Sequence, residues 1–337
     1  MKTNNIVLLT FDFEMFLGRS GTVSNCLTKP VNALLGVFKE LNIRATFFVD
    51  ATFVHFLKKN GLTKEYGEVS MCIQKLLRAG NRIELHIHPQ WYDAKYEEKT
   101  NEFTFPQFRY YTLRACPKKI RTSMFEDSLQ DLLEICRTVD DNYKIKGYRA
   151  GGWCIDDFKD IEPYFKKYNI KFDSSVLPHC SKGGTIQSFD YKDIPVGIDY
   201  YYFQEDVHHV MDKGYLEVPV SVYKATPLVK ISRFMGRKLN PDSTIPFGDG
   251  HSIDKFGTEA VRHNLKFIGR KLFSKQYEFC SIDGYCNANN LANLVSTRPI
   301  TTIVGHPKSL TKKSIKAIRR ISATGCKFLT ISEYFNL

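Results

Sequence analysis

The sequence predicts an α/β protein, specifically a distorted (β/α) barrel of about seven parallel strands with long insertions. Short runs rich in Val, Ile, Phe and Thr alternate along the chain with stretches of helical periodicity. Such alternation implies parallel strands joined by crossover helices. Four of the strand-like runs also end in acidic, basic or imidazole side chains, and barrels of this kind carry their active groups at the carboxyl ends of several strands. An open doubly wound sheet is the alternative arrangement.

The strands are predicted where β-branched and aromatic residues dominate a short run. In chain order these runs are residues 6–11, 45–49, 83–88, 147–150, 172–176, 216–220, 301–304 and 328–331. The first run leads into Asp12 and then into acidic and bulky residues rather than a glycine-rich loop. Nucleotide binding of the usual kind is therefore disfavoured.

The helices are predicted where apolar residues recur at helical spacing. They cover residues 31–41, 68–77, 124–138, 156–168, 253–268 and 310–321. Three segments are too long and irregular to be simple connections, namely residues 90–121, 187–215 and 224–250. Long loops after strands often build the site of a barrel enzyme. We expect one barrel domain over residues 1–337 with insertions at these three places.

The formal charge of +12 raises the question of nucleic-acid binding. Basic residues concentrate in two runs, residues 224–238 and residues 308–320. In the second run they alternate with apolar residues at helical spacing, which is typical of the solvated face of an amphipathic helix. No nucleic-acid-binding motif accompanies either run, so no nucleic-acid partner is expected, whereas a phosphate-bearing or acidic substrate would suit such a surface.

The sequence also bears on the cellular compartment. It contains no apolar run of membrane-spanning length, and the apolar stretch at residues 6–9 is too short for a signal peptide. The nine cysteines form no CxxC pair, and a chain of this size does not need disulfides for stability. We expect a cytoplasmic protein with reduced cysteines and no membrane span.

Two strand ends carry pairs of side chains that suit a metal site. Asp12 and Glu14 follow the first strand, and His86 and His88 end the third. Residues i and i+2 of a strand point to the same side, so each pair is presented in one direction. Oxygen and nitrogen ligands of this kind hold a divalent ion, most simply Zn²⁺. We assign Glu14, His86 and His88 as ligands, and Asp12 as the base, because the longer Glu14 side chain reaches further.

The other two polar strand ends complete a predicted catalytic set. His306 ends the strand at residues 301–304 and suits a general acid that protonates a leaving amine. Arg149 would keep the base carboxylate ionised and in place. Asp173 would do the converse for His306 by keeping it protonated.

Aromatic residues are the candidates for substrate binding. The 90–121 segment is dense in them, and aromatic faces beside polar groups suit sugar rings. Trp91, Tyr148 and Trp153 are the residues assigned to this role. The other reading of the aromatic segment is that its rings pack the insertion onto the barrel.

Taken together, these motifs resemble the polysaccharide deacetylase family, carbohydrate esterase family 4. The resemblance rests on Thr-Phe-Asp at 10–12, Ala-Thr-Phe-Phe-Val at 45–49, Leu-His-Ile-His-Pro-Gln-Trp at 85–91, Tyr-Arg-Ala-Gly-Gly at 148–152, Phe-Asp-Ser-Ser at 172–175 and Gly-His-Pro at 305–307. It implies a distorted barrel and metal-dependent removal of an acetyl group from an amino-sugar nitrogen. By the family's pattern, the matching residues are Asp12 as base, His86 as ligand, Arg149 as orienting residue, His306 as acid and Asp173 as its partner.

The metal motifs depart from that pattern at two positions. Phe13 stands where most members have a second acidic residue, which is displaced here to Glu14, and Gln90 stands where the second histidine is usual. Either His88 or Gln90 would then complete the metal site. The resemblance suggests an N-acetylated sugar precursor, nucleotide-linked or lipid-linked, in bacterial surface-polysaccharide biosynthesis. The alternatives are hydrolysis of a non-sugar amide or formyl group, and a non-catalytic carbohydrate-binding barrel that has lost its metal.

Overall fold

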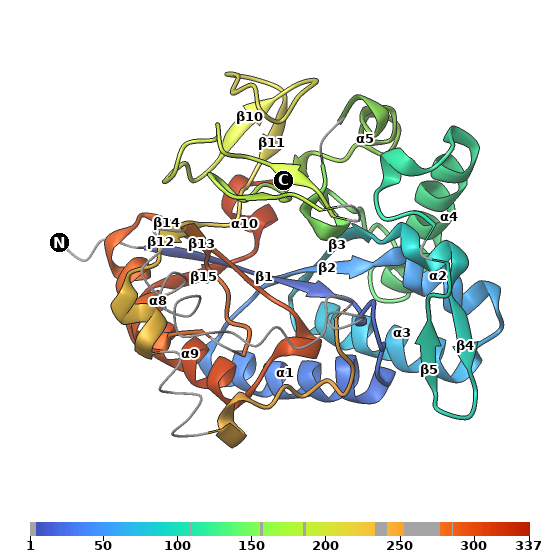
Figure 1. Cartoon of the computed structure of the whole chain (residues 1–337), viewed down its shortest axis with the longest axis horizontal. Coiled ribbons are helices and arrows are strands. Elements are labelled where there is room, and N and C mark those ends of the chain that lie inside the picture. The colour runs from blue at the N-terminus through green and yellow to red at the C-terminus, as the bar shows by residue number, and fades with distance from the viewer. Residues whose placement is uncertain are drawn as a thin grey trace.

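A curled sheet of nine strands forms the centre of the protein (Figure 1). The computed structural model describes residues 5–107, 109–155, 158–184, 187–232, 241–252, 277–284 and 286–337. The sheet consists of β1 (Ile6–Phe13), β2 (Thr46–Asp50), β3 (Arg82–Ile87), β6 (Gly147–Ala150), β7 (Phe172–Asp173), β10 (Tyr201–Phe203), β11 (Tyr215–Glu217), β14 (Ile300–Gly305) and β15 (Lys327–Leu329). Their order is β10-β11-β7-β6-β3-β2-β1-β14, and β15 pairs with β1.

Within this sheet, all the strand pairs are parallel except β10 with β11. The central strands are buried along almost their whole length, as parallel strands covered on both faces must be. β1 has three neighbours: β14 lies along most of it, while β15 pairs with its start and β2 with its end. The polar ends of β1, β3, β6 and β14 consequently face the same edge of the sheet.

The curl brings the two ends of the sheet toward each other. The segment after β11 reaches β14, where the Ser221 amide donates to the Thr302 carbonyl at 3.0 Å. On the same strand, the Val304 amide donates to the Cys280 carbonyl at 3.0 Å. These backbone contacts bridge the gap between β14 and the β7–β11 side, which gives the sheet the form of a distorted barrel.

Helices surround the sheet on its outer side (Figure 1). They are α1 (Lys29–Leu41), α2 (Ala51–Lys59), α3 (Thr63–Arg78), α4 (Lys118–Arg137), α5 (Glu162–Tyr168), α8 (Ala288–Thr297), α9 (Lys312–Ser322) and α10 (Ile331–Phe335). The α9 helix begins at a capping box built on Thr311 and Ser314. It buries Ala317, Ile318 and Ile321 and turns most of its basic residues to solvent. The interpretation of residues 312–320 as a solvated helix face is thereby confirmed.

The predicted fold class is confirmed, and all eight predicted strands are present as the parallel strands of the sheet. Among the helices, the sequence patterns missed α2, α8 and α10, and α4 starts six residues before the predicted 124 at Lys118. The α5 helix is shorter than predicted and starts at Glu162. The helix predicted at 253–268 and part of the basic run 224–238 lie outside the described residues. Among the described helices, none combines the length and apolar character needed to cross a bilayer.

The segments predicted as insertions contain short elements. Residues 90–121 include most of η2 (Pro89–Asp93), the β4 (Lys95–Glu97)–β5 (Glu102–Thr104) hairpin and η3 (Leu113–Ala115). Residues 187–215 include β9 (Phe189–Asp190), which pairs with β8 (Ser181–Lys182), and also β10, the edge strand of the central sheet that the sequence patterns missed. A third hairpin pairs β12 (Val222–Lys224) with β13 (Tyr277–Phe279), and the described part of the third insertion includes η6 (Pro241–Thr244). The β4–β5 hairpin packs on the barrel through Phe103, whose ring contacts Phe53 and Trp91.

Candidate functional site

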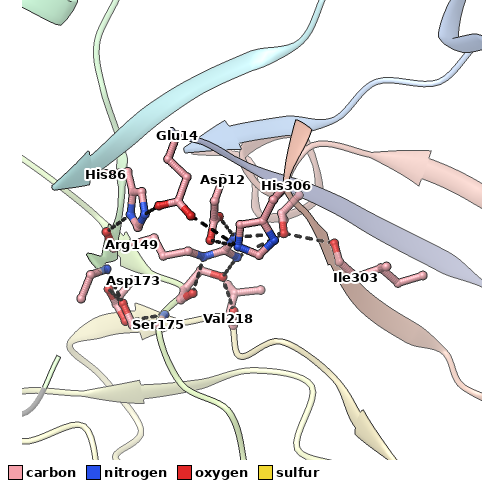
Figure 2. A network of polar contacts seen from close by, with 12 residues as sticks. Asp12, Glu14, His86, Arg149, Asp173, Ser175, Val218, Ile303 and His306 are labelled. Carbon is pink, nitrogen blue, oxygen red and sulfur yellow. Dashed lines mark hydrogen bonds and ion pairs between the residues drawn. The ribbon is translucent and has the colours of Figure 1, made fainter. Parts of the chain in front are cut away.

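A pocket of about 170 Å³ opens at the carboxyl ends of β1, β3, β6 and β14. It is lined by Asp12, Glu14, Leu17, His86, His88, Tyr111, Ala150, Gly152, Trp153, Gln187, Ser252, His306 and Lys308. Asp12, Glu14, His86, His88 and His306 were predicted from the sequence to converge here. The structure brings all five together, and Figure 2 shows Asp12, Glu14, His86 and His306 among them.

Glu14, His86 and His88 form a compact group of possible metal ligands. Glu14 Oε2 lies 2.6 Å from His88 Nε2 and 3.2 Å from His86 Nε2. The two Nε2 atoms are 2.9 Å apart. All three side chains are buried, and their ligand atoms lie within 4.8 Å of one another. One oxygen and two nitrogen donors, with room for water or substrate in the pocket, are the ligand type of a catalytic zinc site.

Backbone contacts hold the two imidazoles in place. His86 Nδ1 lies 2.7 Å from the Arg149 carbonyl oxygen, which only accepts, so Nδ1 carries a hydrogen and Nε2 is the nitrogen turned toward Glu14 and available to a metal ion. The Thr52 hydroxyl accepts from the His88 amide at 2.9 Å and donates to the His88 carbonyl at 3.1 Å. Gln90, the other candidate ligand, is buried but does not line the pocket. The structure therefore places His88, not Gln90, in the ligand group.

Lys308 is a site residue that the sequence patterns missed. Its Nζ donates to Glu14 Oε1 and to the Met15 carbonyl, both at 2.8 Å. Burial alone would raise the pKa of Glu14, but the charge of Lys308 and the contacts with His88 and His86 outweigh burial and lower it. Glu14 is thus held as a carboxylate with Oε2 turned toward the imidazoles. Lys308 is the first residue of the basic run 308–320, which was predicted to form the solvated face of a helix. For Lys308 this prediction is wrong, because its side chain is buried in the site.

Arg149 fixes Asp12. Its Nη1 donates to Asp12 Oδ1 at 2.5 Å. Burial would raise the pKa of Asp12, but the charges of Arg149, His306 and His86 outweigh it and hold the pKa below its ordinary value. Asp12 is therefore ionised near neutral pH, as predicted, with Oδ2 facing His306 Nε2 at 3.5 Å.

His306 has a different partner from the predicted one. Its Nδ1 lies 2.7 Å from Asp283 Oδ2, and its backbone amide donates to Asp283 Oδ1 at 2.8 Å. Burial would lower the pKa of His306, but Asp283 and Asp12 together raise it to about 10. The predicted pairing of Asp173 with His306 is wrong, because Asp283 occupies that place. Asp283 follows β13 (Tyr277–Phe279) and lies outside every strand and helix predicted from the sequence.

Asp173 instead belongs to a buried pair of acids. It accepts hydrogen bonds from the Ser175 amide and hydroxyl, both at 2.8 Å (Figure 2). Glu217 stands directly beside it in the register of β7 and β11. Burial and the adjacent Asp173 raise the pKa of Glu217 well above its ordinary value, and burial raises that of Asp173. Two buried carboxylates this close would repel each other, so ionising both is unfavourable and the pair keeps one proton between them.

The three aromatic residues predicted to bind substrate lie in different surroundings in the structure. Trp153 lines the pocket, and its ring lies 5.2 Å from the Arg149 guanidinium carbon. Trp91 is 3% exposed, donates from Nε1 to Asp50 at 2.6 Å and packs among phenylalanines. Tyr148 is 1% exposed and packs against Phe125. A substrate role for Trp91 and Tyr148 is therefore wrong at this pocket, whereas Tyr111 lines it and was not singled out.

Comparisons with known proteins give structural similarity only. No protein family model matches the chain, and no curated protein sequence matches it. A Mycobacterium smegmatis protein assigned as a polysaccharide deacetylase superposes with a TM-score of 0.49 and 14% identity, covering 99% of this chain and 90% of the other. The catalytic domain of a peptidoglycan N-acetylglucosamine deacetylase from Eubacterium rectale gives 0.40 and 13%, covering 97% and 89%. A family 4 carbohydrate esterase from Streptomyces lividans gives 0.39 and 10%, covering 96% and 88%. All three TM-scores are below 0.5, so these similarities do not establish the function of this chain.

Replacing His86 by Ala should abolish zinc binding at the pocket. The variant loses one of three ligand atoms, and we expect its affinity to fall by more than about 100-fold, beyond what loss of an outer-shell contact costs. Titration calorimetry and metal analysis of the purified protein measure this. His55→Ala is the control, because His55 pairs with Asp131 and does not line this pocket. Equal zinc binding by the wild type and His86→Ala would contradict the assignment.

The Asp173–Glu217 pair should make stability depend on pH. Both carboxyls have a higher pKa in the folded than in the unfolded protein, where the pKa is about 4. The protonated pair therefore stabilises the fold fully below about pH 4, and this contribution is lost as the pH rises through the pKa values of the folded protein. The free energy of unfolding should therefore fall from about pH 5 upward, and Glu217→Gln should reduce that fall. Urea denaturation across this range measures it. The exposed Glu97→Gln should leave the slope unchanged, and a wild-type slope in Glu217→Gln would disprove the shared proton.

Proposed function

We propose that this chain is a metal-dependent amide hydrolase that removes an N-acetyl group from an amino sugar or sugar precursor, and that one barrel domain over residues 1–337 carries this activity. The supporting observation is that one pocket holds an ionised carboxylate, a protonated imidazole and a set of three metal ligands. These are the groups that hydrolysis of an unactivated amide requires. The resemblance to the polysaccharide deacetylases supports the same reaction, and we propose membership of that family.

The proposed metal site consists of Glu14, His86 and His88. Zn²⁺ bound there would polarise the acetyl carbonyl and bring the pKa of a water molecule toward neutrality. Lys308 keeps Glu14 ionised and directs one of its oxygens to the imidazoles. The Arg149 carbonyl holds the Nδ1 hydrogen of His86, so Nε2 is the nitrogen that would bind the metal ion.

Asp12 takes a proton from the attacking water in this proposal. The water oxygen bonds to the acetyl carbon while Asp12 Oδ2, the oxygen that Arg149 does not hold, receives the proton. The lowered pKa of Asp12 makes it a weak base but ensures that it is ionised at neutral pH.

His306 then protonates the leaving nitrogen. Its raised pKa keeps the imidazole protonated at neutral pH, so His306 can donate a proton in the pocket. The C–N bond breaks, and the products are acetate and the free amine. Asp283 acts through His306 and is a positioning residue, because it holds Nδ1 and leaves Nε2 facing the pocket.

The sugar ring is proposed to lie against Trp153 and Tyr111. Both aromatic residues line the pocket beside the catalytic groups, and aromatic faces next to polar groups suit sugars. A volume of about 170 Å³ is below the range usual for whole-ligand sites. The pocket therefore fits an acetamido group better than a complete precursor. A nucleotide-linked or lipid-linked sugar, used in the cytoplasm for surface-polysaccharide synthesis, remains the proposed substrate class.

Replacing Asp12 by Asn should reduce acetate release from N-acetylated sugars by about 10²- to 10⁴-fold, the range for loss of a general base. Zinc binding should persist, because Asp12 is not in the ligand group. Acetate and formate release from sugar and non-sugar amides, with metal analysis in parallel, measures both. Formate release, or cleavage of non-sugar amides alone, would favour the alternative substrates. A wild-type protein that binds sugar but releases neither acid would favour the non-catalytic barrel.

Replacing Asp283 by Asn should move the alkaline limb of the kcat/KM profile to lower pH. His306 acts in its protonated form, so activity falls as the pH rises through its pKa, and removing the Asp283 charge lowers that pKa, by about 1 unit or more. Rate measurements against pH test the shift. Asp173→Asn is the matched control and should leave the limb in place. If the alkaline limb shifted in Asp173→Asn but not in Asp283→Asn, Asp173 rather than Asp283 would be the partner of His306.

A further inference from the structure

A second and larger pocket lies on the other side of the turn that follows His88. It has a volume of about 480 Å³ and is formed by α2, η2 and the first turns of α4. This volume falls within the range usual for small-molecule sites. Of its lining residues, the catalytic assignment uses only Thr52, which holds the backbone of His88.

The lining of this second pocket suits a ligand that is part anionic and part ring. Buried Phe56 and Trp91 contribute apolar wall, and Tyr92 is 49% exposed above it. Lys59 and Lys119 bring two positive charges, and neither forms an ion pair within the part of the chain that the structure describes. Neither Asp nor Glu is among the described lining residues. Two carboxylates lie just behind the lining, because Asp131 pairs with His55 and Asp127 accepts a hydrogen bond from Ser123. The exposed charged side chains of the pocket itself are Lys59 and Lys119, which suit a phosphate group.

Two contacts connect the second pocket with the catalytic one. Thr52 lines the second pocket, and its hydroxyl bonds both backbone groups of His88. On the surface, the ring of Tyr92 packs edge-on against that of Tyr110, with centroids 5.6 Å apart. The next residue, Tyr111, lines the catalytic pocket. Tyr92, Tyr110 and Tyr111 thus lie between the two pockets, and we call these three residues the aromatic connection.

We propose that the second pocket binds the phosphate-bearing part of the substrate while the acetamido group occupies the catalytic pocket. This inference rests on the proposed function and extends it to substrate class. Lys59 and Lys119 would pair with the phosphates, and the aromatic connection would carry the intervening ring. A simple N-acetylated sugar then reaches the catalytic pocket but gains nothing from the second one.

The test is equilibrium binding to the metal-free protein, so that a phosphate group cannot bind through a metal ion. The probes are N-acetylglucosamine, its uridine-diphosphate derivative and inorganic pyrophosphate, measured by calorimetry. The uridine-diphosphate sugar should bind most tightly. The double variant Lys59→Gln/Lys119→Gln should weaken its binding at least about tenfold, since each lysine supplies a charge-assisted contact.

A matched control separates site binding from overall charge. Lys312→Gln/Lys316→Gln removes the same charge from exposed positions on α9, on the other side of the barrel (Figure 1), and should change binding less than about twofold. Equal weakening by both double variants, or none by either, would overturn the proposal. Pyrophosphate binding as tightly as the sugar derivative would also overturn it, because the pocket would then hold a free anion rather than part of a substrate.

The proposed function is tested independently of this pocket. Acetate release from N-acetylglucosamine by the zinc-loaded wild type depends on the catalytic pocket alone. If acetate is released while the Lys59→Gln/Lys119→Gln variant binds the uridine-diphosphate sugar normally, only the second-pocket proposal fails. If that variant binds poorly and no acetate is released by the wild type, only the proposed hydrolysis fails.

Discussion

The rest of the site depends on the contacts of one buried group, the guanidinium of Arg149. A charge without solvent must be paired and fully hydrogen-bonded. Arg149 meets this requirement through Asp12, the Ser174 carbonyl and hydroxyl, and the Thr10 hydroxyl, and its guanidinium carbon lies 4.0 Å from the centre of the Phe48 ring. Because these partners come from β1, β2 and the segment after β7, one side chain joins several strands at their functional ends. Its backbone carbonyl also orients His86, so the base and a metal ligand are aligned by the same residue.

The site also balances its charges in pairs before any ligand arrives. Glu14 is paired with Lys308, Asp12 with Arg149, and His306 with Asp283. Each partner also bonds a backbone group: Arg149 donates to the Ser174 carbonyl, Lys308 donates to the Met15 carbonyl, and Asp283 accepts from the His306 amide. Such preorganisation avoids rearrangement when charge develops during a reaction.

The sequence predicted the parts of the structure that depend on local periodicity. Alternation along a strand placed Asp12 with Glu14 and His86 with His88, and the common edge of a parallel sheet brought them together. It did not predict Asp283, which lies outside every predicted strand and helix, or Lys308, which belongs to a run of basic residues. The pairing of Asp173 failed because its neighbour Glu217 lies on a strand far along the chain. Tyr148 is a packed ring and Trp91 lies outside the catalytic pocket, and residue type alone does not reveal either fact.

The position of β1 in the sheet affects how the chain must fold. Its neighbours β14 and β15 come from the far end of the sequence, with Ile6 opposite both Ile300 and Lys327. Contacts of such long sequence separation form slowly, because a large loop must close before they stabilise anything. β1 is synthesised well before β14 and β15, so its edge stays unpaired until both of those strands have been made. The proposed base on β1 and the proposed acid after β14 can therefore meet only once this pairing has formed, and a chain that lacks it has no complete acid–base pair.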